Sequence, residues 1–182
     1  RCMALETVEM VAPAALQALP VLVVDDNKTA RHALQSMLQQ FGWRSTGVGS
    51  GQEALTQIQQ GMAEENPYAV VLVDGLMPEM DGVTTIRQIA AISTGRVPRM
   101  ILLSHFGREE GVSRNVAGLA IVRNKPVPCA LLFDTLMEMF GVACSKTFRR
   151  HEDASHPDHV AGQIGGARVL LVEDNVINQE VG

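Results

Sequence analysis

The chain has few of the features that mark several classes of protein. Its three cysteines, Cys2, Cys129 and Cys144, are odd in number and include no C-x-x-C pair, which fits a reducing compartment better than a disulfide framework. No apolar run approaches the roughly 20 residues of a membrane helix. The net charge is −5 and the basic residues are scattered, so no surface for nucleic acid or an anionic membrane is indicated. We therefore expect a soluble, cytoplasmic segment that does not bind DNA.

The apolar content, 46% of 182 residues, is sufficient for one core with extensions at both ends. Strand patterns are expected at Val21–Val24, Trp43–Val48, Ala69–Val73, Met100–Leu103 and Leu119–Val122. Helical patterns alternate with them at Lys28–Gln40, Gly51–Gln60, Val83–Ile92, Arg108–Ala117 and Cys129–Phe140. Ser50 and Glu53 form a capping box for the second of these helices, and Gly61 is expected to end it.

The near-continuous Val, Leu and Ile content of these strands is typical of strands buried on both faces of a parallel sheet. Right-handed crossovers then predict an α/β fold with a doubly wound, five-stranded parallel sheet of the flavodoxin-like type. The expected strand order is 2-1-3-4-5.

Polar side chains stand where the apolar strands end. Asp25 and Asp26 close VLVVDD, Asp74 closes VVLVD, Ser104 closes RMILLS and Lys125 closes AIVRNK. Ligands of open parallel sheets bind beyond the carboxyl ends of the strands, so these groups can converge although they are far apart in sequence. Taken singly, the two adjacent acids could instead cap the helix near Lys28, Ser104 could be a loop hydroxyl, and Lys125 could be solvated.

Three carboxylates in one crevice would repel one another unless a hard cation lay among them, and Mg²⁺ is the natural occupant of an oxygen-rich site. With the cation bound, Asp74 could act as a nucleophile toward phosphorus. Lys125 would supply a fixed positive charge to one phosphoryl oxygen, and Ser104 a hydrogen bond to another. The expected product is an aspartyl phosphate.

This ordered set of residues, with VVLVDGLMPEMDG at 70–82, resembles the receiver domain of two-component response regulators over Leu19–Gly141. The resemblance implies that Asp74 is the phosphoacceptor. It also implies that Asp26 and Asp74 bind Mg²⁺ directly, Asp25 through water, and the backbone carbonyl of Leu76 completes the ligands. The bond preceding Pro126 would be cis.

Two positions depart from the common pattern of that family. His105 follows Ser104 where a small residue is usual, and it could restrict access to the phosphoryl group. Val122 stands where an aromatic switch residue is frequent, a role that Phe106 could take over in part. These departures keep open a degenerate receiver that acts only as an interaction module. A phosphohydrolase of the haloacid dehalogenase type is a remote alternative, because it expects a second acid where this chain has Leu76.

The expected organisation is a linker or short helix at 1–18, a receiver domain at 19–142 and a flexible linker at 143–166. Residues 167–182 would begin a second receiver, because VLLVEDN repeats the VLVVDDN of the first. Arg1 and Gly182 suggest that both ends were cut from a longer protein. Neither a histidine-kinase H-box nor a glycine-rich nucleotide box is found, so the chain itself is expected to be a phosphoacceptor module rather than a kinase.

The tandem pattern favours the C-terminal part of a hybrid sensor histidine kinase. If that kinase is a membrane-bound sensor, this segment is expected in its cytoplasmic part. The expected donor is a phosphohistidine on that kinase or on a histidine phosphotransfer domain. The sequence does not identify the stimulus, the pathway or the oligomeric state.

Overall fold

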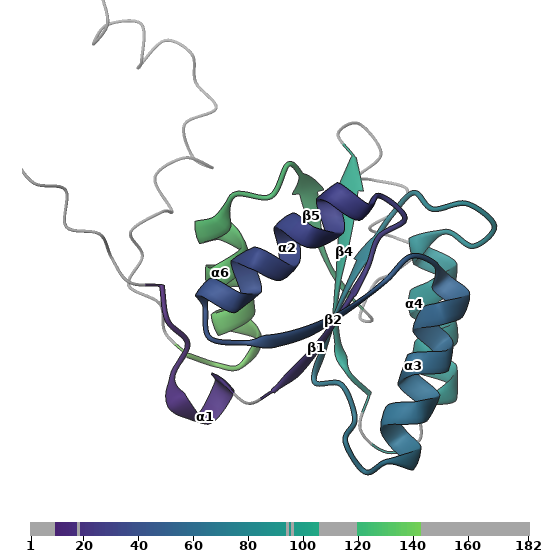
Figure 1. Cartoon of the computed structure of the whole chain (residues 1–182), viewed down its shortest axis with the longest axis horizontal. Helices are drawn as coiled ribbons and strands as arrows, with labels where there is room; N and C mark the ends of the chain where they lie inside the picture. The colour runs from purple at the N-terminus through teal and green to yellow at the C-terminus, as the bar shows by residue number, and fades with distance from the viewer. Residues whose placement is uncertain (1–9, 18, 94, 96, 106–119, 143–182) are drawn as a thin grey trace, which may run out of the picture. The chain divides into compact units, whose positions relative to one another are not determined.

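The computed structural model describes residues 10–17, 19–93, 95, 97–105 and 120–142 (Figure 1). Its strands are β1 (Pro20–Val24), β2 (Arg44–Val48), β3 (Val70–Asp74), β4 (Arg99–His105) and β5 (Ala120–Lys125). Its helices are α1 (Ala14–Gln17), α2 (Lys28–Gln40), α3 (Gly51–Ala63), α4 (Gly82–Ile92) and α6 (Cys129–Met139). Within these ranges no helix is both long and apolar enough to cross a membrane.

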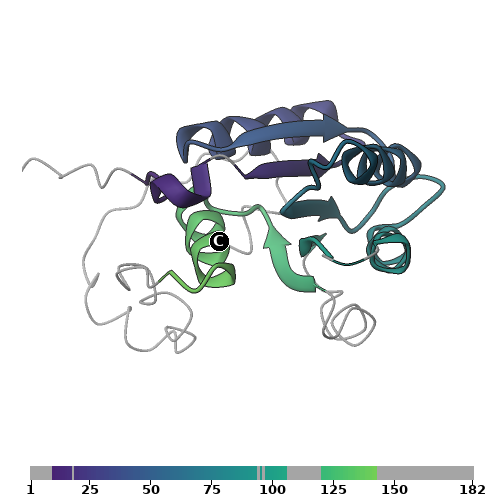
Figure 2. The same cartoon turned by 90° about the horizontal axis from the view of Figure 1, so that it is seen from below.

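The five strands form one parallel sheet in the order β2-β1-β3-β4-β5, which confirms the predicted topology. Helices cover both faces of this sheet. Figures 1 and 2 show α2 and α6 on one side and α3 and α4 on the other. The predicted helix at 108–117 and the predicted linker and repeat at 143–182 lie outside the described residues.

The core is divided by the sheet into two apolar clusters. In β1, Val21 and Val23 contact the cluster under α2 and α6, whereas Leu22 and Val24 contact the cluster under α3 and α4. Strands β1 and β3 are therefore buried on both faces, as side-chain alternation along a strand requires. Each such Val or Leu contributes about 1.5–3 kcal/mol relative to an exposed side chain. This stability holds the carboxyl ends of the strands in fixed register.

The end of α3 differs from the sequence prediction. The helix continues through Gly61, which is buried, and finishes at its C-cap Glu64. Gly61 serves close packing, because a Cβ there would lie 3.0 Å from the carbonyl oxygen of Asn66. The chain reverses at Glu65, whose φ of 56° is left-handed, and the Asn66 amide donates to the Gly61 carbonyl. This is the Schellman arrangement with a glutamate where glycine is usual.

We predict that Glu65→Gly raises the free energy of unfolding by about 0.5–1 kcal/mol, because glycine adopts positive φ without the steric cost of a Cβ. Glu65→Ala keeps the Cβ and should give no such gain. Urea unfolding followed by circular dichroism measures both. A stabilisation by alanine equal to that by glycine would show that the glutamate charge, and not its φ, is unfavourable.

The segment that precedes β1 packs against the domain. Ala12 is buried, and its amide donates to the Phe41 carbonyl at 2.9 Å. The side-chain amide of Gln17 donates to the Ala12 carbonyl at 2.8 Å. Met10 and Leu16 pack against the cluster under α2 and α6. Residues 10–17 thus cover the end of this cluster that lies away from the carboxyl ends of the strands.

We predict that Ala12→Asp lowers the free energy of unfolding by about 2 kcal/mol, since it buries a carboxylate without a counter-charge. The neighbouring Val11, which is 48% exposed, provides the matched control. Val11→Asp should change stability by no more than about 0.5 kcal/mol. Equal effects of the two substitutions in urea unfolding would refute a packed N-terminal segment.

Candidate functional site

The predicted site residues meet at the carboxyl end of the sheet. Asp74 is the last residue of β3 and pairs with Leu103 of β4. Ser104 is the next residue of β4, and Lys125 is the last residue of β5. Asp25 follows β1, the other neighbour of β3. The parallel register therefore brings four separate segments to one edge of the sheet.

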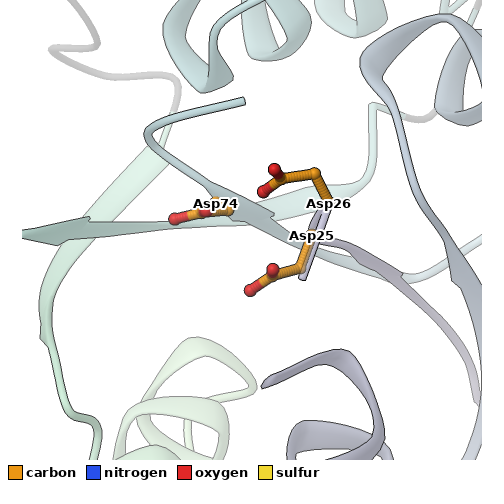
Figure 3. A group of neighbouring side chains, drawn as sticks. All are labelled: Asp25, Asp26 and Asp74. Carbon is orange, nitrogen blue, oxygen red and sulfur yellow. The ribbon is translucent and has the colours of Figure 1, made fainter. Parts of the chain in front are cut away.

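The three acids lie close together and turn their carboxylates to the same region beyond the strand ends (Figure 3). One oxygen from each of Asp25, Asp26 and Asp74 lies within 4.8 Å of the others. Asp25 and Asp74 are buried, whereas Asp26 is exposed. The adjacent carboxylates of Asp25 and Asp26 thus differ in their surroundings, because Asp25 is enclosed by protein and Asp26 faces solvent.

Lys125 links the two buried acids. Its Nζ lies 2.7 Å from Oδ2 of Asp25 and 2.9 Å from Oδ1 of Asp74. Burial lowers the pKa of Lys125, but the hydrogen bonds and charges of Asp25 and Asp74 raise it more, so that the pKa lies above the ordinary 10.5. The lysine is therefore fully charged at neutral pH and balances part of the negative charge at the site.

The donor set fits Mg²⁺. The ion prefers carboxylate oxygens at about 2.1 Å, so opposite ligands around it are about 4.2 Å apart. The 4.8 Å within which the three carboxylate oxygens lie is close to that value, so small side-chain movements could bring them to one ion, with water at its remaining positions. Asp25 has less freedom than the others, because its Oδ1 also accepts a hydrogen bond from the Asn27 amide at 2.9 Å. Direct coordination by Asp26 and Asp74, with Asp25 acting through water, stays a prediction.

The alternative role of the two adjacent acids as helix caps is wrong. The N-cap of α2 is Asn27, whose side chain accepts from the amides of Thr29 and Ala30. Asn is as effective an N-cap as Asp, and it lies one residue closer to the helix. Asp25 and Asp26 are therefore not needed for capping.

The loop between β3 and α4 wraps tightly around the end of β3. A Cβ on Gly82 would lie 2.2 Å from the carbonyl oxygen of Asp74, so glycine is required there by close backbone approach. Asp81 caps α4 by accepting from the Thr84 amide at 2.7 Å. Leu76 lies in this loop with 45% of its surface exposed, and the metal-ligand role of its carbonyl stays a prediction.

Several residues that bear on phosphoryl binding and switching lie near this edge. Ser104 is buried at the end of β4, and the Lys125–Pro126 peptide bond is cis, as the resemblance implied. Val122 is half-buried and packs against the cluster under α3 and α4. The side chain of His105 and all of Phe106 lie outside the described residues, so their suggested effects stay predictions.

Comparison with known proteins identifies the class. The sequence model of the response regulator receiver domain family matches residues 21–137, and the chain belongs to this family. It is 31% identical over 147 residues to the transcriptional regulatory protein ZraR of Salmonella typhimurium, covering 81% of this chain but 31% of that protein. It is 30% identical over 129 residues to the sensory/regulatory protein RpfC of Xanthomonas campestris, covering 69% and 17% respectively. The chain thus spans about a third or less of these relatives.

Solved structures agree with this assignment. A CheY-like receiver from Methylobacillus flagellatus has the same fold, with a TM-score of 0.58 and 22% identity over 67% of this chain and 98% of that one. The receiver domain of the histidine kinase CKI1 from Arabidopsis thaliana, solved with Mg²⁺, gives a TM-score of 0.59 and 26% identity over 66% and 91%. The chain is therefore a receiver domain of a two-component system.

We predict that Lys125→Met lowers the free energy of unfolding by about 3 kcal/mol at neutral pH, because Asp25 is left buried without its counter-charge. The folded-state pKa of Lys125 is raised, so its contribution is complete below pH 10.5 and is lost as the pH rises through the folded value. The exposed Lys28 provides the control: Lys28→Met should cost no more than about 0.5 kcal/mol. Urea unfolding from pH 8 to beyond 10.5 measures this. A deficit of Lys125→Met that persists unchanged over the whole range would contradict the ion pair.

Proposed function

We propose that this chain is a phosphoacceptor receiver that takes a phosphoryl group from a phosphohistidine onto Asp74 in a Mg²⁺-dependent reaction. The observation that carries the proposal is the position of Asp74. Its carboxylate lies at the end of a buried strand, 2.9 Å from the cation of Lys125 and within reach of the Asp26 carboxylate. This combination supplies a nucleophile, a fixed positive charge and an oxygen-rich cation site in one place.

The reaction is a transfer between two protein side chains. An Asp74 carboxylate oxygen forms a bond to phosphorus while the bond between phosphorus and the donor imidazole nitrogen breaks. The electron pair of the broken bond stays on that nitrogen, which takes up a proton from water. Bound Mg²⁺ would supply positive charge that allows an anionic donor to approach a carboxylate.

Residues of this chain would then hold the product. Lys125 reaches Asp74 from β5 and can follow a phosphoryl oxygen with its ammonium group. Ser104 projects from the end of β4, beside the end of β3, where its hydroxyl can donate to a second phosphoryl oxygen. Movement of these two groups would change the surface that follows β4, which is the readout expected of a two-state element.

The protein context proposed for this module is a hybrid sensor histidine kinase. Two similar proteins support it by their names: RpfC is a sensory/regulatory protein, and the CKI1 receiver belongs to a histidine kinase. The repeat of VLVVDDN at 21–27 as VLLVEDN at 169–175 supports a second receiver. The partner would be the kinase or a histidine phosphotransfer domain.

We predict that incubation with acetyl phosphate and Mg²⁺ adds one phosphoryl group to the chain, detected by intact mass. Asp74→Ala should abolish the adduct because the attacking oxygen is removed. Asp134→Ala on α6 removes an aspartate outside the site and should leave the adduct unchanged. Asp26→Asn should reduce its yield at low Mg²⁺ concentration, because one direct ligand loses its charge.

Each alternative gives a different result in the same assay. Absence of any adduct from a folded wild-type chain would select the degenerate receiver, and His105→Ala would then be the next variant to test. Rapid hydrolysis of a phosphate ester would revive the phosphohydrolase. An adduct that persists in Asp74→Ala would refute the proposed acceptor.

A further inference from the structure

The turn between β1 and α2 is held at Asp25 by hydrogen bonds to its backbone and its side chain. Its amide donates to the Val48 carbonyl at 3.2 Å, and its Oδ1 accepts from the Asn27 amide at 2.9 Å. Its Oδ2 lies 2.7 Å from Nζ of Lys125. Its carbonyl oxygen accepts from Nη1 of Arg31 at 2.5 Å. The last of these contacts has no part in the chemistry proposed above.

Arg31 reaches this carbonyl from the first turn of α2, six residues along the chain. Its Nη1 also lies beside the loop after β2, since a Cβ on Gly49 would be 3.7 Å from it. The Gly49 amide in turn donates to the carboxylate of Glu53 on α3 at 2.9 Å. The guanidinium therefore lies at the junction of two loops that border the acidic site, and Arg31 itself is half-buried.

The carbonyl that Arg31 holds belongs to the peptide unit between Asp25 and Asp26. A peptide unit is planar, so fixing its oxygen also fixes the amide nitrogen and the Cα of the next residue. The Asp26 carboxylate extends from that Cα toward Asp74 and is otherwise exposed (Figure 3). The direction of this exposed side chain thus depends on the orientation of the peptide that precedes it.

We infer that Arg31 is a positioning residue for Mg²⁺: its guanidinium orients the Asp25–Asp26 peptide so that the Asp26 carboxylate faces Asp74 across the cation site. This inference rests on the proposed function, because it concerns the same Mg²⁺. Partners that orient a metal ligand without touching the metal change its affinity by about 10- to 100-fold when they are removed.

Loss of the Arg31 charge and loss of its positioning role have opposite expected effects on Mg²⁺ affinity, which makes the inference testable. The positive charge of Arg31 repels a cation at the nearby site, so charge alone predicts that its removal tightens Mg²⁺ binding. Loss of positioning predicts weaker binding, because Asp26 must then be ordered when the metal binds. The sign of the change therefore distinguishes the two effects.

The experiment is a calorimetric Mg²⁺ titration of the full chain at constant ionic strength. Arg31→Gln should raise the Kd about tenfold. Gln also carries a donor, but its side chain is too short to replace the guanidinium, whereas Arg31→Lys keeps a donor on a long side chain and should recover most of the affinity. Arg44→Gln removes an exposed charge at the start of β2 and should leave the Kd unchanged. The urea midpoint of Arg31→Gln in metal-free buffer should stay near that of wild type.

An unchanged or lower Kd for Arg31→Gln, beside measurable binding by wild type, would overturn the inference and leave the proposed function intact. A wild-type chain that binds no Mg²⁺ would refute the proposed function and the inference with it. Should Arg31→Gln fail to fold, Arg31→Met repeats the comparison with the apolar stem retained. Failure of both to fold would also overturn the inference, since Arg31 would then serve the fold and not the metal.

Discussion

The ion pairs of Lys125 with Asp25 and Asp74 are the interaction on which the rest of the site depends. Two carboxylates with almost no solvent exposure would destabilise the end of the sheet if they lacked a counter-charge. Lys125 supplies that charge from β5, which is separated from β1 by β3 and β4 in the sheet. The pairing therefore needs the four strands β1, β3, β4 and β5 in correct register. The buried Val and Leu side chains of β1 and β3 help to hold that register. The core thus fixes the strand ends, and Lys125 offsets the energetic cost of burying Asp25 and Asp74.

The sheet and most of the site were predictable from the sequence for a physical reason. A strand buried on both faces must be apolar along its length, so Val21–Val24 and Val70–Val73 are distinct from any amphipathic segment. Parallel strands place their carboxyl ends together, so the residues that follow them are neighbours whatever their separation in the chain. Asp25, Asp74 and Lys125 could be brought together by this rule alone. The structure also shows what the sequence could not: Asp25 is an ion-pair partner of Lys125, at a distance of 2.7 Å.

Other features could not be read from the sequence, because they depend on competition between similar residues or on tertiary contact. Three polar residues, Asp25, Asp26 and Asn27, can each cap a helix, and only the path of the turn decides that Asn27 does so. Gly61 carries the usual signal for a helix end, yet it lies within α3 because the chain packs closely against it and Glu65 makes the turn. Arg31 resembles any basic residue on a helix until the carbonyl of Asp25 is seen to accept from it.

The arrangement of the three acids around Lys125 limits how far a substitution can stabilise the site. Neutralising one acid would relieve repulsion among Asp25, Asp26 and Asp74, but it would also remove either a counter-ion of Lys125 or a ligand that the proposed function assigns to Mg²⁺. A ligand that binds only the folded state stabilises that state in proportion to the logarithm of its concentration over Kd. Mg²⁺ binding would therefore return stability that the crowded carboxylates cost in its absence. In the proposed mechanism the nucleophile, the main lysine partner and the exposed metal ligand are three different carboxylates, which would account for three acids at one site.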